Sequence, residues 1–238
     1  MIRNIVFYIC LFPLTALFSS LCWFFAKPGG DNELSHRLEC VWARLLLLSG
    51  GVKVEADLSA LTPGKSYVFM ANHQSNLDIP ALFSVLSDYN FRFLAKKELF
   101  SIPLFGPAMA RIGHVNIDRQ NRRKAMEAIQ SAVESVDRGM SLLIFPEGTR
   151  GPDPSTFGEF KTGGMIVALK CRAMVAPLIV TGSARVLPKK ALLLRPGTIR
   201  ITALPPFDPA EHYTLKSREE FKNDLRSRML AAYLERIA

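Results

Sequence analysis

An uncharged stretch near the start of the chain sets the strongest limit on how it can fold. Ile5–Phe25 contains no charged residue and lies between Arg3 and Lys27. As a helix it would be roughly 30 Å long, about the thickness of a bilayer hydrocarbon core. Trp23 lies near one end, where an interfacial aromatic residue is expected. The run is too long for a signal peptide and no A-x-A site follows it, so we expect a membrane-associated helix rather than a cleaved leader.

A second apolar stretch follows the turn at residues 28–32. Its apolar residues recur on a helical period and are interrupted by Arg37, Glu39 and Arg44. The stretch is too short to span a bilayer, so it either lies at the membrane interface or packs as a buried core helix, and the pattern favours neither. Together the two stretches predict an N-terminal membrane-associated helical hairpin over residues 1–50.

From about residue 52 the pattern changes to short β-branched and aromatic runs that alternate with helical periods. This alternation predicts an α/β domain over residues 51–238, with a mixed, largely parallel sheet covered by helices. The expected strands are Val52–Glu55, Tyr67–Met70, Phe91–Leu94, His114–Ile117, Ser141–Phe145, Val175–Val180 and Thr198–Thr202. The expected helices include Asn121–Asp137, Lys161–Arg172 and about Ser217–Ile237, the last with a capping box of Ser217 and Glu220.

The charge balance narrows the class of ligand. The chain has 30 Lys and Arg against 21 Asp and Glu, and such an excess attracts nucleic acid, anionic lipid or phosphorylated substrates. No nucleic-acid-binding motif is present and the basic residues are scattered, so we expect lipid and phosphate ligands and no nucleic acid. The four cysteines form no C-x-x-C pair, which suits a reducing compartment. No cluster has the spacing of metal ligands, so we expect no metal and no bound cofactor.

A histidine and an aspartate five residues apart follow the second expected strand. Pro80 fits only the first turn of a helix, which places His73 on the loop and Asp78 at the helix start. If the loop folds back, the carboxylate accepts from one imidazole nitrogen and leaves the other as a base that can deprotonate a hydroxyl. On spacing alone, a plain capping box of Ser75 and Asp78 beside a surface histidine is the stronger interpretation.

Four sequence blocks change that interpretation, because they occur in a fixed order over roughly residues 66–180. They are Asn72-His73-x-Ser75-x-x-Asp78; Lys96-Lys97-Glu98-Leu99 with Pro103, Phe105-Gly106, Gly113 and Ile117-Asp118-Arg119; Phe145-Pro146-Glu147-Gly148-Thr149-Arg150; and Phe160-Lys161-x-Gly163 with the strand that contains Pro177. In this order they resemble the motifs of the glycerolipid acyltransferases, in particular the bacterial 1-acylglycerol-3-phosphate acyltransferases. Four ordered blocks are far more specific than any one of them.

The resemblance implies a reaction. A fatty acyl group would pass from acyl-CoA or acyl carrier protein to the free hydroxyl of 1-acylglycerol 3-phosphate, which gives phosphatidic acid. His73 would be the general base and Asp78 the carboxylate that orients it, as in the HX4D motif of the family. The chain has no Gly-x-Ser-x-Gly elbow and no cysteine near His73, so we expect direct transfer without an acyl-enzyme.

The acceptor's phosphate requires cations, and a guanidinium group offers a planar fork that fits phosphate oxygens. By resemblance, the residues that bind it are Arg119, Glu147, Gly148, Thr149 and Arg150, with help from Lys96 or Lys97. Glu147 is expected to orient an arginine or to touch a hydroxyl. Without the resemblance, Arg119 would be interpreted as a surface ion-pair partner and Gly148 as a turn glycine. Lys161 is evenly balanced between a phosphate contact and a solvated helix N-terminus.

The cytosolic donor implies that the catalytic domain faces the cytoplasm at a cell inner membrane. Five basic residues either contact an anionic leaflet or form a solvated face: Arg185, Lys189, Lys190, Arg195 and Arg200. Two other functions stay open. One is an acyltransferase that acts on glycerol 3-phosphate or another lysophospholipid. The other is a non-catalytic membrane protein that binds lipid phosphate, against which the intact His73 and Asp78 pair argues.

Overall fold

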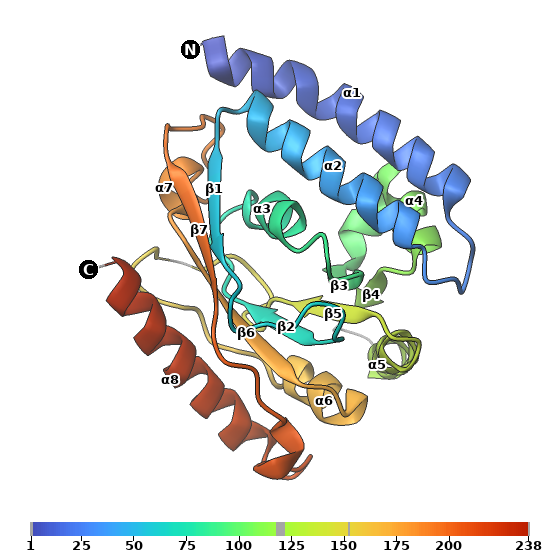
Figure 1. Ribbon diagram of the computed structural model, residues 1–238, viewed down its shortest axis with the longest axis vertical. Helices are drawn as coiled ribbons and strands as arrows, with labels where there is room; N and C mark the ends of the chain where they lie inside the picture. The colour runs from blue at the N-terminus through green and yellow to red at the C-terminus, as the bar shows by residue number, and fades with distance from the viewer. Residues whose placement is uncertain (1, 118–121, 152, 238) are drawn as a thin grey trace.

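A sheet of seven strands runs through the middle of the computed structural model, which describes residues 2–117, 122–151 and 153–237 (Figure 1). In sheet order the strands are β1 (Lys53–Asp57), β7 (Thr198–Ala203), β6 (Val175–Thr181), β2 (Val68–Ala71), β5 (Ser141–Ile144), β3 (Phe91–Lys96) and β4 (Val115–Ile117). The strands from β6 to β4 are parallel to one another, while β7 is antiparallel to β6 and parallel to β1. The predicted mixed, largely parallel sheet is confirmed, and every predicted strand is present with its ends shifted by at most two residues.

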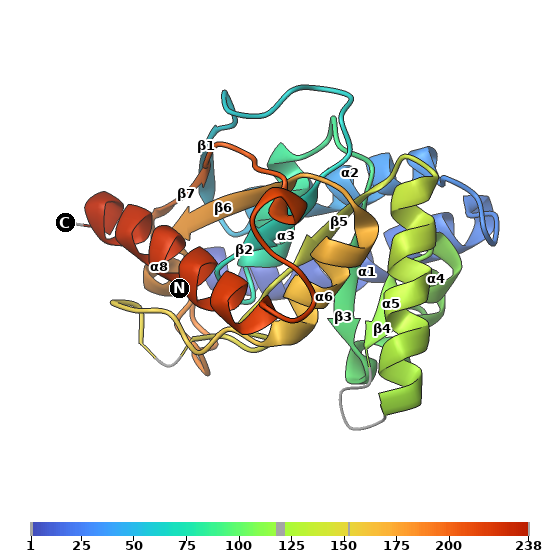
Figure 2. The same ribbon diagram turned by 90° about the horizontal axis from the view of Figure 1, so that it is seen from below.

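Helices cover both faces of the sheet (Figures 1 and 2). One layer holds α1 (Ile2–Phe25), α2 (Glu33–Ser49), α3 (Asp78–Val85) and α4 (Phe105–Ile112), and the other holds α5 (Arg122–Asp137), α6 (Thr162–Cys171) and α8 (Arg218–Ile237). The short elements are η1 (Lys97–Ser101), α7 (Ser183–Val186) and η2 (Pro209–Glu211). Strands β2, β5 and β6 are buried along their whole length, which explains their almost unbroken apolar sequences.

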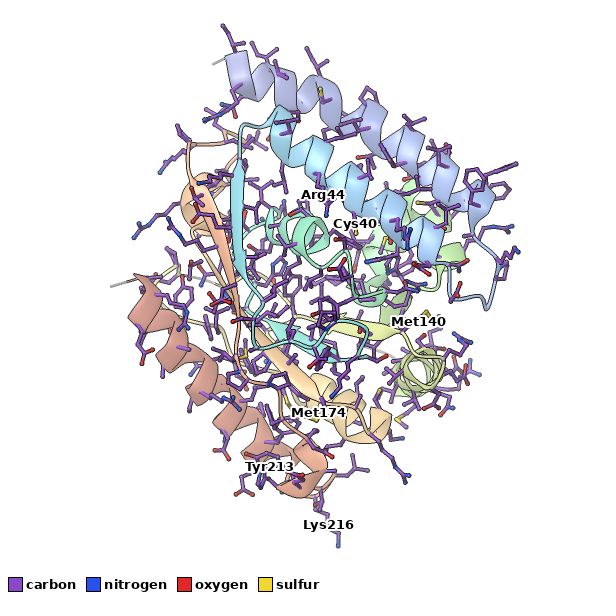
Figure 3. The ribbon with its side chains drawn as sticks, viewed as in Figure 1. Cys40, Arg44, Met140, Met174, Tyr213 and Lys216 are labelled. Atoms are coloured by element: carbon purple, nitrogen blue, oxygen red, sulfur yellow. The ribbon has the colours of Figure 1, made fainter. Side chains whose placement is uncertain are left out.

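Helix α2 lies between α1 and α3 (Figure 1). Its inner side buries Ala43 and Leu47 in the same core as residues of the sheet, whereas Leu48 on the outer side is exposed. Arg44, labelled in Figure 3, donates to the carbonyl of Ser84 in α3 over 3.0 Å. The inner side of this segment therefore packs as a core helix, and its position at a membrane interface stays a prediction for the exposed side.

Helix α1 is fixed to the protein at both ends. Near its start, Nη2 of Arg3 donates to the carbonyl of Leu194 over 2.7 Å. Just after its end, Nε of Arg111 in α4 donates to the carbonyl of Ala26 over 2.9 Å. Its outward side chains, including Ile2, Ile9, Phe12 and Phe24, are exposed. Among the described helices, only α1 is long and apolar enough to cross a membrane, yet these contacts hold it along the surface of the α/β layers.

Two local features differ from the sequence prediction. Helix α4 was not predicted, because Gly106 and Pro107 break its helical pattern. Pro107 lies in the first turn, where proline is tolerated, and a Cβ on Gly106 would lie 2.1 Å from the carbonyl oxygen of Phe100. At the start of α8, the hydroxyl of Ser217 accepts from the preceding amide of Thr214 over 2.8 Å rather than forming the expected capping box.

Candidate active site

The sequence blocks meet because the strands that precede them are parallel neighbours. Loop 72–77 follows β2, loop 145–151 follows β5, and Lys96 ends β3, so all three lie at the carboxyl edge of the sheet. They line a cleft of about 390 Å³ that includes His73, Lys96, Phe145, Gly148, Thr149 and Arg150. Residues far apart in the sequence are therefore presented to a single ligand site.

The side chains of His73 and Asp78 form a hydrogen-bonded pair at the start of α3. Nδ1–H of His73 donates to Oδ2 of Asp78 over 2.8 Å. The same oxygen accepts from the backbone amides of Gln74, over 2.7 Å, and Ser75, over 2.8 Å. Asp78 is fully buried. Its carboxylate therefore fixes both the course of the loop and the orientation of the imidazole.

The imidazole ring of His73 lies flat against Phe145. The two ring centroids are 4.0 Å apart and the planes differ by 4°. The His73 side chain is 13% exposed and lines the cleft. Because Nδ1 faces Asp78, Nε2 is the ring nitrogen left to act on a ligand.

The residues around His73 fix its loop to the β6 side of the sheet. The amide of Asn72 donates to the carbonyl of Val180 and accepts from its N–H, each over 2.8 Å. The hydroxyl of Ser75 donates to the carbonyl of Leu187 over 2.8 Å. These bonds explain why an amide and a hydroxyl flank the histidine in the first motif.

Glu147 joins the His73 loop to two other segments. Its carboxylate is buried and accepts from the backbone N–H of His73 over 2.8 Å and from that of Gly158 over 2.7 Å. The carbonyl of His73 in turn accepts from the N–H of Gly151 over 2.7 Å. Burial raises the pKa of Glu147, and the two backbone amides oppose that rise. In this geometry the carboxylate holds the main chain of His73 in place.

Arg150 and Lys96 bring positive charge to the same cleft as His73. Arg150 follows a tight turn in which the N–H of Gly148 donates to the carbonyl of Phe145 over 2.9 Å. Gly148 has a φ of 68°, which glycine adopts readily. The arrangement can hold an anionic group of a ligand while another part of that ligand faces the imidazole.

Two other basic residues of the motifs, Lys97 and Lys161, line other cavities. Lys97 lines a different cavity, beside α4 and α5. Lys161 lines a groove between α5 and α6 and forms an ion pair with Glu159, whose carboxylate oxygen is 2.8 Å from the ammonium group. Arg119 lies outside the described residues, just beyond the end of β4.

Comparison with known proteins identifies the family. A family model described as acyltransferase matches residues 52–181, more than half of the chain. The chain belongs to the acyltransferase family. The matched part contains the His73–Asp78 pair, Glu147 and Arg150.

Individual relatives agree with this assignment. The acyltransferase is 32% identical over 185 residues to a 1-acyl-sn-glycerol-3-phosphate acyltransferase of Helicobacter pylori, covering 78% of this chain and 75% of the relative. It is 36% identical over 177 residues to one from Chlamydomonas reinhardtii, covering 73% of this chain and 52% of the relative. The chain thus spans about half the length of the algal relative.

The fold is shared with a solved structure. The crystal structure of the 1-acyl-sn-glycerophosphate acyltransferase of Thermotoga maritima matches with a TM-score of 0.78 at 21% identity, over 97% of this chain and 94% of that chain. The match therefore includes the N-terminal helices as well as the α/β layers.

An apolar cavity of about 60 Å³ lies next to the cleft of this acyltransferase, between α1, α2 and α4. Both spaces are lined by Ile79, Phe93 and Leu99. In the wall of the cavity, Nε2–H of His114 donates to Glu39 over 2.6 Å, and Nδ1 accepts from the N–H of Phe93 over 3.0 Å. The cavity offers an apolar surface directly beside the cleft that contains His73.

Phe145 and Gly158 take part in contacts of the acyltransferase site that were not predicted. Phe145 stacks on His73, and membership of the third motif was the only sequence signal for it. Gly158 binds Glu147 but lies outside all four blocks, so no sequence pattern pointed to it.

Proposed function

We propose that this acyltransferase moves a fatty acyl group from acyl-CoA or acyl carrier protein to the free hydroxyl of 1-acylglycerol 3-phosphate, giving phosphatidic acid. The observation that carries the proposal is the His73–Asp78 pair, 2.8 Å apart, in one cleft with Arg150 and Lys96. The two relatives described above, both 1-acyl-sn-glycerol-3-phosphate acyltransferases, suggest the acceptor.

In the proposed reaction, Nε2 of His73 takes the proton of the acceptor hydroxyl as that oxygen attacks the thioester carbonyl. The tetrahedral intermediate then collapses, the carbon–sulfur bond breaks, and the thiolate takes the proton from the imidazolium. Asp78 holds the correct tautomer and stabilises the imidazolium by its charge. The hydroxyl oxygen of the acceptor forms its bond directly with the acyl carbon of the thioester, so no acyl-enzyme forms.

Arg150 and Lys96 are proposed to bind the acceptor's phosphate, and Arg119 is assigned the same role by the motif. Their charge orients the glycerol so that its hydroxyl meets Nε2, and such positioning lowers the barrier in addition to base catalysis. In this proposal Glu147 acts through His73 and not on the phosphate, because its oxygens bind two backbone amides.

The lipid nature of the acceptor explains the N-terminal helices. Each methylene drawn into water would cost about 0.8 kcal/mol, so the proposed enzyme works at a membrane surface. We place it at the cell inner membrane with its cleft toward the cytoplasm, where the thioester donors are found. Orientation is testable by protease protection of spheroplasts and of inverted vesicles.

The test is a donor-by-acceptor assay with purified protein in mixed micelles. The wild type should form phosphatidic acid, and His73→Ala should lower kcat by about 10²–10⁴-fold while the melting temperature changes little. Full activity of His73→Ala would refute the mechanism. A hydrolysis-sensitive acyl adduct on the protein would refute direct transfer, and a preference for glycerol 3-phosphate would establish the alternative acceptor.

A further inference from the structure

A loop between α7 and β7 exposes two leucines among basic residues. We call residues 188–196, with the sequence Pro-Lys-Lys-Ala-Leu-Leu-Leu-Arg-Pro, the leucine loop. Leu192 is 73% exposed and Leu193 is 67% exposed, whereas Leu194 is 3% exposed. One leucine thus holds the loop in the core while its two neighbours face outward.

The leucine loop is attached to the start of α1. The carbonyl of Leu194 accepts from Arg3 over 2.7 Å, and its N–H donates to Oδ1 of Asn4 over 2.6 Å. The hydroxyl of Tyr8 donates to the carbonyl of Leu192. Figure 1 shows the segment after α7 reaching toward the N-terminal end of α1. The exposed leucines therefore belong to a loop that is fixed to the first turns of α1, where Ile2 is also exposed.

The other end of the leucine loop is attached to the candidate active site. The carbonyl of Leu187, just before the loop, accepts from the hydroxyl of Ser75 over 2.8 Å. Within the loop, Nζ of Lys189 donates to the carbonyl of Arg150 over 2.8 Å. The loop thus connects α1 with the first and third sequence blocks of the cleft.

The charge of the leucine loop identifies its partner. Lys189, Lys190 and Arg195 are all exposed, and residues 183–207 contain no Asp or Glu. Exposed leucines flanked by cations suit an anionic lipid surface, where apolar side chains enter the interface and cations contact headgroups.

We propose that the leucine loop is a second membrane contact, separate from α1, in which Leu192 and Leu193 insert into an anionic bilayer and Lys189, Lys190 and Arg195 bind its headgroups. This inference rests on the proposed function, because it places the mouth of the cleft at the surface that contains the lysolipid. The hydrogen bonds of Leu187 to Ser75 and of Lys189 to Arg150 hold the opening of the cleft at a fixed position relative to the inserted loop.

The first test compares full-length Leu192→Asp/Leu193→Asp with Met174→Asp. Met174 is partly exposed and precedes β6, at the sheet edge opposite the cleft, and is labelled near α6 in Figure 3. Binding is measured by flotation with vesicles of phosphatidylcholine, with and without phosphatidylglycerol. The leucine variant should bind the anionic vesicles at least about tenfold more weakly than wild type, and Met174→Asp should bind like wild type. Equal loss in both variants, or none in the leucine variant, overturns the proposal.

A second measurement locates the loop directly. Trp23 and Trp42 are the native tryptophans, and both are first changed to Phe. Leu193→Trp and Met174→Trp are then made separately in this background, so that each protein has a single tryptophan. Brominated lipid in the anionic vesicles should quench the tryptophan at 193 and not the one at 174. Absence of quenching at 193 overturns membrane insertion even if α1 binds.

Activity separates this proposal from the proposed function. With a short-chain 1-acylglycerol 3-phosphate below its micelle concentration, Leu192→Asp/Leu193→Asp should keep wild-type activity, and on vesicle-borne acceptor its activity should fall with its binding. Equal losses on both acceptors would show that the leucines act on the site and would overturn the proposal. Failure of the proposed function would give a different result. The wild-type protein would bind vesicles through the loop but would form no phosphatidic acid.

Discussion

Glu147→Gln tests whether this residue positions the base or touches the substrate. In the wild type both carboxylate oxygens are occupied, one by the amide of His73 at 2.8 Å and one by that of Gly158 at 2.7 Å. Glutamine has one oxygen and one NH₂ group. In either orientation, the NH₂ group faces a backbone N–H, so one of the two hydrogen bonds is replaced by two opposed donors.

The size of the effect follows from the lost bond. A hydrogen bond to a buried charged acceptor contributes about 1.5–3 kcal/mol. Removing the buried charge offsets part of that loss, because burial raises the pKa of Glu147 and so opposes its ionised form. We expect Glu147→Gln to lower the free energy of unfolding by about 2 kcal/mol, which corresponds to a fall in Tm of about 4–8 °C. Displacement of His73 should lower kcat by up to about 10²-fold.

The assay combines thermal unfolding, followed by circular dichroism, with the kinetics of acyl transfer. A residue that positions His73 should lower Tm and kcat with little change in the KM of the acceptor. A residue that binds the phosphate should leave Tm unchanged and raise that KM. The second pattern would refute the reasoning and restore the role that the sequence motif implied for Glu147.

Two further predictions concern stability. Burial lowers the pKa of His36 from 6.5 to about 4. At a pH between these two pKa values, His36 is protonated in the unfolded chain and neutral in the folded protein. The free energy of unfolding should therefore fall by about 3 kcal/mol from pH 7 to pH 4 through this group, and urea unfolding of His36→Phe should lack that part of the pH dependence. Gly106→Ala places its Cβ 2.1 Å from the Phe100 carbonyl oxygen. The free energy of unfolding should therefore fall by about 3 kcal/mol or more, which is measured as a lower Tm. Gly163→Ala, whose Cβ meets nothing within 4 Å, should not lower Tm.

The sequence predicted contacts that are local and missed those that depend on strand order. His73 and Asp78 are five residues apart on one loop, so Pro80 and the helix start were enough to bring them together. Glu147 meets His73 only because β5 is the sheet neighbour of β2, and no local pattern encodes strand order. The same limit applies to Asn72, which binds β6 on the other side of β2.

Neighbouring lysines illustrate a second limit. Lys96 ends β3 and lines the cleft, while Lys97 starts η1 and lines a cavity on another side. The chain changes from an extended strand to a 3-10 helix between the two lysines, so the point at which the strand ends decides which lysine reaches the site. The motif contains both residues and does not distinguish them.

The contacts of α1 argue that this helix supports the candidate active site in addition to its proposed role at the membrane. Phe7 packs in the same core as Leu194, and a Cβ on Gly50 would lie 3.0 Å from Phe7 and 2.9 Å from Leu194. Leu194 belongs to the segment that begins at Leu187, whose carbonyl binds the loop of His73 through Ser75. Removing α1 would therefore expose this core and release one support of the His73 loop. Loss of activity after such a truncation would report both effects, which is why surface substitutions in the leucine loop separate membrane binding from catalysis better than deletion of the helix.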